Sequence, residues 1–541
     1  MRLSSKVLIV AMIVMMICCV SAASATDVDD IAVTEDADII EVDDAADSVD
    51  IVEQDDSSDD IIEDVDDSQI GETDDDIVAD EKVTGTKGLQ NKIYNHTISK
   101  YFDTTTGYIK SSAPSGLIFV GTFDHVPFEN FIINKSISLS FSNANFENVG
   151  FKLLYPGLTI NGATFTSDTS ASNVASIYAG ANGITIKNVN FNITAPSNDD
   201  YYAINVENAN NTKILNNIIY YQCGYANPDN YNYAIKVKNS TGVKVIGNNI
   251  TAILPLKTVK HYVLDGLDKD FVAGVAVTHS NNFNFTKNTL NVTGIIRDGG
   301  YPTLDAFIMW YSNNSYIGDN KITDKDVIST TNQYSYIYGI DVFESNYVNI
   351  NNNTVTMNAD QSGGYVGGNG TGAAYCVQLT GGYTGVVVSN NTLITQNHGP
   401  NTAIYSQNYN GFTNITVIGN TIQVTGKGTA STWDLVTGME LQDDYAYVAG
   451  NTITVNNIGS YGNNYNVYGI SYCQASPRTH TYIIINNTVD VINGYYTVYI
   501  MNGQNCNITG NTLHSRYSSN DYYGNQTVYI VGNGNYVGPN P

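Results

Sequence analysis

An eight-residue pattern of apolar and polar positions recurs along the chain from about residue 183 to the C-terminus. Apolar residues fall at its first, third and eighth places, while Gly or Asn followed by Asn usually fills the fifth and sixth. A unit that returns every few tens of residues is typical of a solenoid. The clearest copies are VKVIGNNI (243–250), FNFTKNTL (283–290), VNINNNTV (348–355), VVVSNNTL (386–393), ITVIGNTI (415–422), AYVAGNTI (446–453), YIIINNTV (482–489) and CNITGNTL (506–513).

The alternation at the start of each copy predicts a strand with one buried face. The break at the fifth and sixth places predicts a tight corner, because Asn and Gly tolerate the left-handed backbone that such a corner requires. If the coils stack, the sixth-place amides lie above one another and can hydrogen-bond as a ladder. The predicted ladder consists of Asn217, Asn248, Asn288, Asn320, Asn353, Asn391, Asn420, Asn451, Asn487 and Asn511.

A second strand is predicted ahead of each copy, because pairs of apolar residues recur eight and six positions before its first place. Each coil is then a strand, a bend, a strand, an Asn corner, a short strand and a loop of variable length. The apolar pairs are Ile204/Val206, Ile235/Val237, Val275/Val277, Phe307/Met309, Ile340/Val342 and Val498/Ile500.

The predicted fold class is therefore all-β, as a right-handed parallel β-helix of about thirteen coils. Successive ladder asparagines are 24 to 40 residues apart. The shortest of these units excludes a β-propeller, whose blades need four antiparallel strands in roughly 40–45 residues.

The ends of the chain differ from the repeats. Residues 1–25 combine a basic start, an apolar run and small residues near Ala25, which predicts a cleaved export signal and an extracellular or cell-surface location. No second apolar run of membrane-spanning length follows, so no membrane span is expected after cleavage. We assign 26–81 to an acidic tail, 82–136 to an N-terminal cap and 137–541 to the β-helix.

The negative charge is concentrated in the tail. Between Asp27 and Glu81 there are 26 acidic residues and no Lys or Arg, whereas the whole chain has 52 acidic and 24 basic residues. The remainder is then 26 acidic against 24 basic, which is nearly neutral. Such a tail is expected to be disordered and to act as a spacer, and its charge argues against nucleic acid as a partner.

The export signal, the Asp-rich tail, the segment IFVGTF…IINKSISL and the repeated NNT coils together resemble adhesin-like surface proteins of methanogenic archaea. More distantly, the repeats are similar to the pectate-lyase-like and NosD-like right-handed β-helix superfamily. The resemblance implies the fold and a surface location. Its motifs specify coil corners and carry no chemistry, so it implies no activity.

No catalytic site, metal site or cofactor is predicted. A lyase on this scaffold needs clustered acids for calcium and a basic residue as proton acceptor, and a glycoside hydrolase needs two or three carboxylates on one strand face. A turn or loop role is the preferred interpretation for the acidic candidates, and the histidines show no metal-binding spacing. The candidates weighed are Arg297, Arg478, Arg516, Asp265, Asp268, Asp270, Asp199–Asp200, Asp443–Asp444 and Asn397-His398-Gly399.

Tyrosine is abundant, with 40 residues, and four tyrosines share one register. Each stands two positions before the apolar pair of the first strand, so the four would form a row along one side of the β-helix. Such a row can bind sugars or a partner protein, or it can simply stack and brace the coils. The four are Tyr202, Tyr233, Tyr338 and Tyr496, and Tyr-rich loops are expected at 461–472 and 517–523.

Three hypotheses for function remain. The first is an exported adhesin-like protein that binds glycans or the surfaces of other cells through the side and loops of the β-helix. The second is a carbohydrate-active enzyme, either a lyase or a hydrolase, on the same scaffold. The third is a structural surface component.

Overall fold

The computed structural model describes residues 91–540, except for 197–199, 224–231, 257–271, 297–302, 329–335, 360–372, 398–400, 409–411, 427–434, 459–465, 473–479 and 517–526. All of the described residues belong to one compact unit, Thr84–Pro541. The predicted export signal and acidic tail lie outside the described residues.

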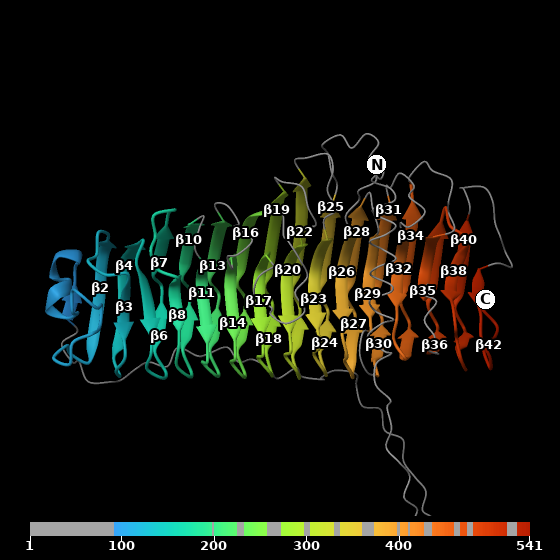
Figure 1. Ribbon diagram of the computed structural model, residues 1–541, viewed down its shortest axis with the longest axis horizontal. Helices are drawn as coiled ribbons and strands as arrows, with labels where there is room; N and C mark the ends of the chain where they lie inside the picture. The colour runs from blue at the N-terminus through green and yellow to red at the C-terminus, as the bar shows by residue number, and fades with distance from the viewer. Residues whose placement is uncertain are drawn as a thin grey trace, which may run out of the picture. The chain divides into compact units, whose positions relative to one another are not determined.

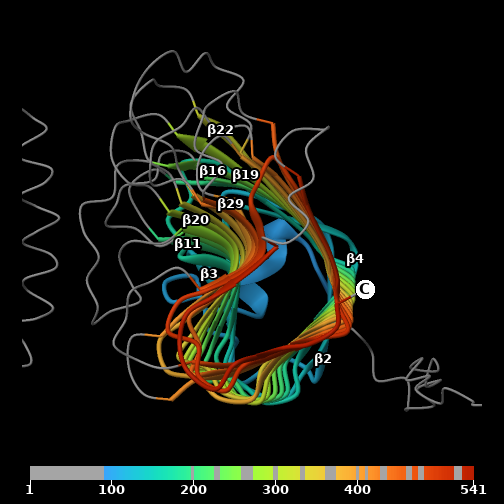
Figure 2. The same ribbon diagram turned by 90° about the vertical axis from the view of Figure 1, so that its right-hand side faces the viewer.

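Within the described residues, the strands form three parallel sheets of 15, 14 and 13 strands. We call these sheets I, II and III in that order. One coil passes through a strand of sheet II, then one of sheet III, then one of sheet I, before the chain returns to sheet II. Figure 1 shows the coils side by side along the axis, and Figure 2 shows strands of successive coils overlying one another around a closed cross-section.

The three sheets differ mainly in strand length, since the strands of sheet III are the shortest. The strands of sheet I are β1 (Asn91–Ile93), β2 (Gly116–Phe123), β4 (Ser138–Glu147), β7 (Thr164–Ser167), β10 (Asn190–Ala195), β13 (Ile218–Cys223), β16 (Asn249–Leu256), β19 (Thr289–Ile296), β22 (Lys321–Ile328), β25 (Thr354–Ala359), β28 (Thr392–Asn397), β31 (Thr421–Gly426), β34 (Thr452–Asn457), β37 (Thr488–Ile492) and β40 (Thr512–Arg516). Those of sheet II are β3 (Asn130–Ile133), β5 (Gly150–Leu153), β8 (Ala175–Ala179), β11 (Tyr201–Glu207), β14 (Asn232–Lys238), β17 (Val272–Thr278), β20 (Thr303–Trp310), β23 (Tyr336–Phe343), β26 (Ala373–Thr380), β29 (Asn401–Gln407), β32 (Val436–Leu441), β35 (Val467–Tyr472), β38 (Tyr496–Ile500) and β41 (Val528–Ile530). Those of sheet III are β6 (Thr159–Asn161), β9 (Thr185–Lys187), β12 (Lys213–Leu215), β15 (Lys244–Ile246), β18 (Asn284–Thr286), β21 (Tyr316–Gly318), β24 (Asn349–Asn351), β27 (Val386–Ser389), β30 (Asn414–Ile418), β33 (Tyr445–Ala449), β36 (Thr481–Ile485), β39 (Asn507–Thr509) and β42 (Tyr536–Val537).

This arrangement is a right-handed parallel β-helix, as the repeat predicts. The predicted apolar pairs are in register, since Ile204 pairs with Ile235 and Ile235 with Val275. The first, third and eighth places of the repeat point into the core, where Ile415, for example, is 1% exposed. Only parallel pairings join the named strands, which excludes the antiparallel blades of a propeller.

The asparagine ladder forms at the corner between sheets III and I. Asn353 is representative: its Oδ1 accepts from the backbone N (3.1 Å) and the Nδ2 (2.9 Å) of Asn320 in the preceding coil. Its own Nδ2 donates to Ile317 O (2.8 Å) and to Asn391 Oδ1 (3.0 Å). The ladder also runs one coil further than the sequence pattern predicts, because Asn540 accepts from Asn511. Each buried amide thus joins two coils.

The fifth place of the repeat, and not the ladder position, adopts the left-handed backbone. Asn352 has a φ of 54° and Gly419 a φ of 67°. The side chain at this place points away from the core, and Asn352 is exposed. The two corner residues therefore have separate roles, one conformational and one in hydrogen bonding.

The segment predicted as the cap, 82–136, already supplies strands β1, β2 and β3 to sheets I and II. A 3-10 helix, η1 (Asn95–Lys100), follows β1. It buries Ile98, and Phe102 just after it lies edge-on to Phe131 with ring centroids 4.9 Å apart. These side chains cover the N-terminal end of the core, while the boundaries of the segment stay a prediction.

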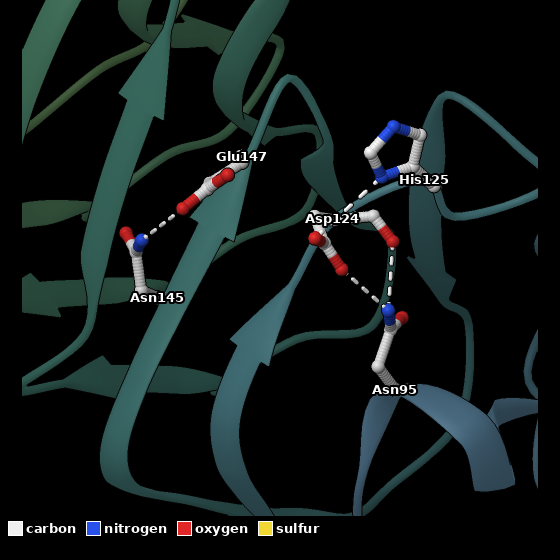
Figure 3. A network of polar contacts seen from close by, with 5 residues as sticks. All are labelled: Asn95, Asp124, His125, Asn145 and Glu147. Atoms are coloured by element: carbon white, nitrogen blue, oxygen red, sulfur yellow. Dashed lines mark hydrogen bonds and ion pairs between the residues drawn. The ribbon is translucent and has the colours of Figure 1, made fainter.

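A polar network holds this end of the unit together at its surface (Figure 3). Asn95 Nδ2 donates to the backbone oxygen (2.8 Å) and the Oδ1 (2.7 Å) of Asp124, in the turn after β2. His125 Nδ1 lies 3.5 Å from the Asp124 carboxylate, and on β4 Asn145 Nδ2 donates to Glu147 (2.8 Å). The side chain of His125 is 96% exposed, so these contacts tie η1 to β2 without forming an enclosed site.

We predict that replacing Asn353 by Ala destabilises the β-helix by about 3 kcal/mol or more, since it leaves several buried backbone groups unpaired. Thermal and denaturant unfolding measure the loss. The matched control is Asn352→Gly, which keeps the left-handed corner and removes an exposed side chain together with its exposed hydrogen bond to Asp319 (2.7 Å). Equal stability of the two variants would contradict the structural role of the ladder.

Candidate functional site

The strands of sheet II carry a kink that turns a row of tyrosines outward. Strict alternation would turn Tyr202 inward together with Ile204 and Val206. Instead, Tyr201, Ala203, Ile204 and Val206 all belong to the core, while Tyr202 packs in a separate cluster outside it. The kink therefore places two adjacent residues on the inner side.

Small residues permit this kink. A Cβ atom added at Gly339 would lie 2.5 Å from Val355 Cγ1 and 2.7 Å from the backbone oxygen of Cys376. A Cβ atom at Gly438 would similarly meet Ile453 (2.5 Å). At these two glycines, backbone and core therefore approach too closely for a larger side chain. The residues at this position are mostly Gly, Ala or Ser, with Cys and Thr at one coil each: Ser176, Ala203, Ala234, Gly274, Ala306, Gly339, Cys376, Ala403, Gly438, Gly469 and Thr497.

The kink gives the outer face of sheet II two parallel rows of side chains, each running from coil to coil along the axis. The first row contains the four predicted tyrosines, and the second lies three positions later in each strand. The first row is Ala175, Tyr202, Tyr233, Ala273, Asp305, Tyr338, Tyr375, Thr402, Thr437, Tyr468 and Tyr496. The second row is Tyr178, Asn205, Lys236, Ala276, Ile308, Asp341, Gln378, Tyr405, Glu440, Ser471, Tyr499 and Tyr529.

The predicted register of Tyr202, Tyr233, Tyr338 and Tyr496 is confirmed, but the row is interrupted. Tyr202 and Tyr233 stack with centroids 6.1 Å apart and are 2% and 5% exposed. Tyr338 is 6% exposed, whereas Tyr496 is half-buried. The stacking contacts of the first three tyrosines brace the coils, and a binding role for the four stays a prediction.

Two clusters of tyrosine lie further along the same face. In the first, Tyr375 stacks on Tyr338 (5.4 Å) and lies 4.8 Å from Tyr405. The second, the C-terminal cluster, consists of Tyr468, Tyr496, Tyr499 and Tyr529. Within it, Tyr499 stacks on Tyr468 (4.7 Å) and on Tyr529 (4.9 Å), and Tyr529 is 38% exposed. Tyr338 and Tyr468 are buried. The accessible aromatic surface of the face therefore consists of the half-buried Tyr375, Tyr405, Tyr496 and Tyr499 and the exposed Tyr529.

One coil between the two clusters has no aromatic residue in either row. Its strand, β32, contributes Thr437 to the first row and Glu440 to the second. Glu440 is only 4% exposed, and its Oε1 accepts a long hydrogen bond from Gln442 Nε2 (3.3 Å). Burial raises the pKa of Glu440 to about 7, and the Gln442 hydrogen bond only partly opposes this.

A second group of carboxyl side chains lies nearer the middle of the face. Asp305 is fully buried, and neither of its oxygens has a hydrogen-bond partner. Burial and then the nearby Asp341 and Asp324 raise its pKa well above the ordinary value. Asp341, on the next coil, accepts from Trp310 Nε1 (3.4 Å), and burial raises its pKa to about 7. These acids are poised to hold protons at pH values where exposed carboxyls are ionised.

Sequence reasoning missed Asp305, Asp341 and Glu440 because it searched for acidic residues close together in the chain. Strand pairing instead brings them to one face from different coils. The only signal available was their position relative to the apolar pairs, which places Asp305 in the tyrosine row.

Asp443 and Asp444 lie between β32 and β33, as expected for residues of a turn, but their carboxyls bond to neighbouring coils. Asp443 is fully buried and accepts from Tyr383 Oη (2.7 Å) and Ser406 Oγ (2.5 Å). Burial raises its pKa to about 6, and these hydrogen bonds oppose the increase. Asp444 Oδ2 accepts from the backbone N of Thr413 (2.8 Å). Both carboxyls thus satisfy groups at the corner between sheets II and III.

The other predicted candidates do not come together within the described residues. Asn397 is buried at the end of β28, and Arg516 pairs with Asp490 (2.7 Å) on the outer face of sheet I. The prediction of a loop at 461–472 is wrong from Val467 onward, because those residues form β35 with Tyr468 and Tyr472 buried. Candidates outside the described residues are Asp199, Asp265, Asp268, Asp270, Arg297, His398, Gly399, Arg478 and the loop 517–523.

Two further observations apply to the described part of the chain. No group of three or more His, Cys, Asp or Glu side chains there is arranged to hold a metal ion. Among the same residues, no helix has both the length and the apolar character needed to cross a membrane.

No protein-family model and no curated protein sequence matches the chain. Among solved structures, it is similar to the surface adhesin PfbA of Streptococcus pneumoniae, at 12% identity and a TM-score of 0.30, over 79% of this chain and 91% of the adhesin. It is also similar to the Dettilon tailspike protein, at 11% identity and a TM-score of 0.26, over 71% and 62% of the two chains. A PL6-family alginate lyase, AlyGC, is similar at 8% identity and a TM-score of 0.16, over 80% and 100%. At such identities and scores the similarity is no guide to ligand or activity.

The buried carboxyls should make the protein less stable as the pH rises. A carboxyl whose pKa is higher in the folded state stabilises the fold below its unfolded pKa, and this contribution is lost as the pH rises through the folded pKa. For Asp341 this stability is lost between about pH 4 and about pH 7. The pKa of Asp305 is raised well above its ordinary value, so its contribution is lost over a range that extends to higher pH. We predict that the free energy of unfolding falls between these pH values in the wild type. In the double variant Asp305→Asn, Asp341→Asn this fall should be smaller by on the order of a few kcal/mol.

Denaturant unfolding at about pH 5 and about pH 8 measures this difference. Glu207→Gln, on the same face, is the matched control and should follow the wild type. If the double variant shows the same pH dependence as the wild type, the two acids do not hold protons in the folded state.

Proposed function

We propose that this protein is an exported, cell-surface or secreted β-helix that binds glycans on the surfaces of other cells, without altering them. The outer face of sheet II is the binding side. The observation that carries the proposal is the C-terminal cluster, where the stacked rings of Tyr499 and Tyr529, with Tyr496 tilted against them, present accessible ring surface. An accessible aromatic stack is unusual on a surface that has no partner to cover it.

Tyrosine suits a sugar ligand because its ring is apolar and its hydroxyl is polar. The ring covers the C–H face of a pyranose, while the hydroxyl hydrogen-bonds the sugar hydroxyls. The second row also brings Gln378 next to Tyr405. Few rotatable bonds are immobilised on binding, since stacking already orders the rings.

The scaffold supports the same role. Parallel coils stack with a spacing of about 4.8 Å, so aromatic side chains in one row lie at regular intervals along a stiff unit. A polysaccharide that follows the axis can contact both tyrosine clusters at once. Simultaneous contacts of this kind increase the overall affinity without strengthening either contact alone.

We predict that replacing both Tyr499 and Tyr529 by Ala lowers glycan affinity at least about tenfold, or about 1.4 kcal/mol. Glycan arrays identify a ligand for the secreted protein, and calorimetry with that ligand measures the loss. Tyr220→Ala, on the outer face of sheet I and 36% exposed, is the matched control. An array with no bound glycan, or an equal loss in both variants, would overturn the proposal.

A carbohydrate-active enzyme is the alternative, favoured by one observation. Asp305 and Asp341 lie on the same outer face, on neighbouring coils, and both have a raised pKa. A protonated carboxyl beside an ionised one is the arrangement that glycosidic hydrolysis requires. The proton donor would protonate the glycosidic oxygen, and the carboxylate would accept a proton from the attacking water.

Incubation with pectins and other plant or cell-wall glycans separates the two functions. The binding proposal predicts retention of the glycan with no new reducing or unsaturated ends. New ends that disappear in both Asp305→Asn and Asp341→Asn would establish the enzyme instead. Glu207→Gln controls for general effects of removing a carboxyl from this face.

A further inference from the structure

Sheet I carries two exposed apolar side chains on one strand, β13. Ile218 is 56% exposed and Tyr220 is 36% exposed, whereas Ile219 between them is 1% exposed and belongs to the core. A large apolar side chain on the outer face of a sheet stays in contact with water unless another group covers it. We call Ile218 and Tyr220 the β13 patch.

An asparagine flanks the β13 patch on each side. Tyr220 pairs with Asn192 of β10 in the preceding coil, and Ile218 pairs with Asn249 of β16 in the following coil. Adjacent coils are about 4.8 Å apart, so each apolar side chain lies one such spacing from an asparagine. Both asparagines are exposed, and each begins the sequence NIT. The pattern N-x-S/T is the acceptor sequence for N-linked glycosylation of exported proteins.

Strand alternation turns the acceptor amide and the hydroxyl of each sequence to the outside. Ile193 and Ile250, the middle residues, are both 0% exposed, so the residues on either side of them point away from the core. Within the described part of the chain, neither Asn192 nor Asn249 donates a hydrogen bond from Nδ2, the atom to which a sugar would be linked. Both acceptor nitrogens are therefore available at the surface.

These two asparagines differ from those of the repeated corner. The N-x-S/T sequence at Asn352 arises from the corner pattern itself, and its Nδ2 donates to Asp319 Oδ1 (2.7 Å). Asn249 instead stands where most copies of the repeat have Thr, and Asn192 lies beyond the eighth place of its copy. The architecture of the coil thus accounts for Asn352 and leaves the asparagines beside the β13 patch unexplained.

We propose that Asn192 and Asn249 carry N-linked glycans, and that these glycans cover the β13 patch. The inference rests on the export that the proposed function includes, because glycan transfer to asparagine accompanies export. In the transfer, Nδ2 of the asparagine bonds to C1 of an oligosaccharide carried on a lipid phosphate. The bond between C1 and the phosphate oxygen breaks, the lipid phosphate leaves, and the Nδ2 proton passes to a base of the transferase. Transfer must precede the pairing of β10 and β16, because a strand inside a sheet cannot enter a transferase as a free segment.

The first sugar of each glycan would lie beside the patch. Since Asn192 and Tyr220 are paired neighbours, a pyranose linked to Asn192 can place its C–H face on the tyrosine ring. A sugar linked to Asn249 can cover Ile218 in the same way. Removing these apolar surfaces from water stabilises the modified protein.

The positions of the acceptor sequences leave the proposed binding side uncovered. In the described strands of sheet II, no asparagine begins an N-x-S/T sequence, although Asn205 and Asn401 lie in them. The described strands of the other two sheets do contain such asparagines: Asn192, Asn249 and Asn291 in sheet I, and Asn284, Asn414 and Asn507 in sheet III. A glycan at Asn192 or Asn249 therefore stands on a different face from the tyrosines of sheet II.

Glycopeptide mass spectrometry of the protein recovered outside the cells that produce it tests the modification. Peptides that contain Asn192 and Asn249 should each gain the mass of one oligosaccharide in most molecules, while the residues of the sheet II strands gain none. An unmodified peptide at either asparagine, or a glycan on a sheet II strand, would overturn the inference.

Hydroxyl-radical oxidation of Tyr220 tests the covering role. The double variant Thr194→Val, Thr251→Val keeps both asparagines and removes both acceptor sequences, so oxidation of Tyr220 should rise severalfold above that of the wild type. Thr356→Val, on the outer face of sheet I and outside any acceptor sequence, is the matched control and should leave the oxidation unchanged. Equal oxidation of Tyr220 in the wild type and the double variant would overturn the covering role.

A second double variant, Asn192→Gln with Asn249→Gln, separates loss of the glycans from a folding defect. It should reproduce the increase at Tyr220, while the buried Tyr201 stays unreactive. If Tyr201 is oxidised in one double variant, unfolding explains the increase there and the other double variant decides the outcome. The glycan occupancy of the wild type decides the modification whatever the variants do.

The outcomes separate this inference from the proposed function. Protein recovered outside the cells without these glycans overturns only the inference. Modified protein that binds no glycan on an array overturns the binding function and leaves the modification standing. Absence of the protein from the outside of the cells removes both, since both depend on export.

Discussion

The buried hydrogen bonds of the asparagine ladder are the constraint on which the rest of the structure depends. Each ladder amide bonds to the coil before it and to the coil after it, so the coils cannot slip relative to one another without leaving buried polar groups unpaired. A one-residue slip would also turn every core residue outward. The ladder thereby fixes the register at the corner between sheets III and I, and the strands that follow inherit it. The rows of side chains on every outer face are a consequence.

The outer face of sheet II differs from the other two because its strands are kinked. At the positions of Gly339 and Gly438 the backbone lies too close to the core for a larger side chain, and the adjacent tyrosine-row residue turns outward. The face consequently gathers large aromatic side chains and poorly solvated carboxyls. Burial of these acids raises the pKa of Glu440 and Asp341. The accessible aromatic rings and the carboxyls with a raised pKa therefore lie on one face of the β-helix.

The fold could be predicted from the sequence because its determinants recur. Ladder residues such as Asn353, and apolar pairs such as Ile204/Val206, occupy the same place in coil after coil. The site could be predicted only in part, because function resides in positions that do not recur. Tyr202 was correctly placed in a row, but Glu440 belongs to a row that holds Lys, Ala, Asp, Tyr and Ser in other coils. No pattern of one sequence marks such a position until the pairing of the strands is known.

We propose that ligands bind to the outer face of sheet II and not to the other sides of the β-helix. Hydroxyl-radical footprinting of the secreted protein, alone and when bound to its glycan or to target cells, tests this most directly. We expect protection of Tyr405, Tyr499 and Tyr529, with Tyr220 of sheet I and Tyr447 of sheet III unchanged. Protection of Tyr220 or Tyr447, with the sheet II tyrosines as reactive as in the free protein, would contradict it.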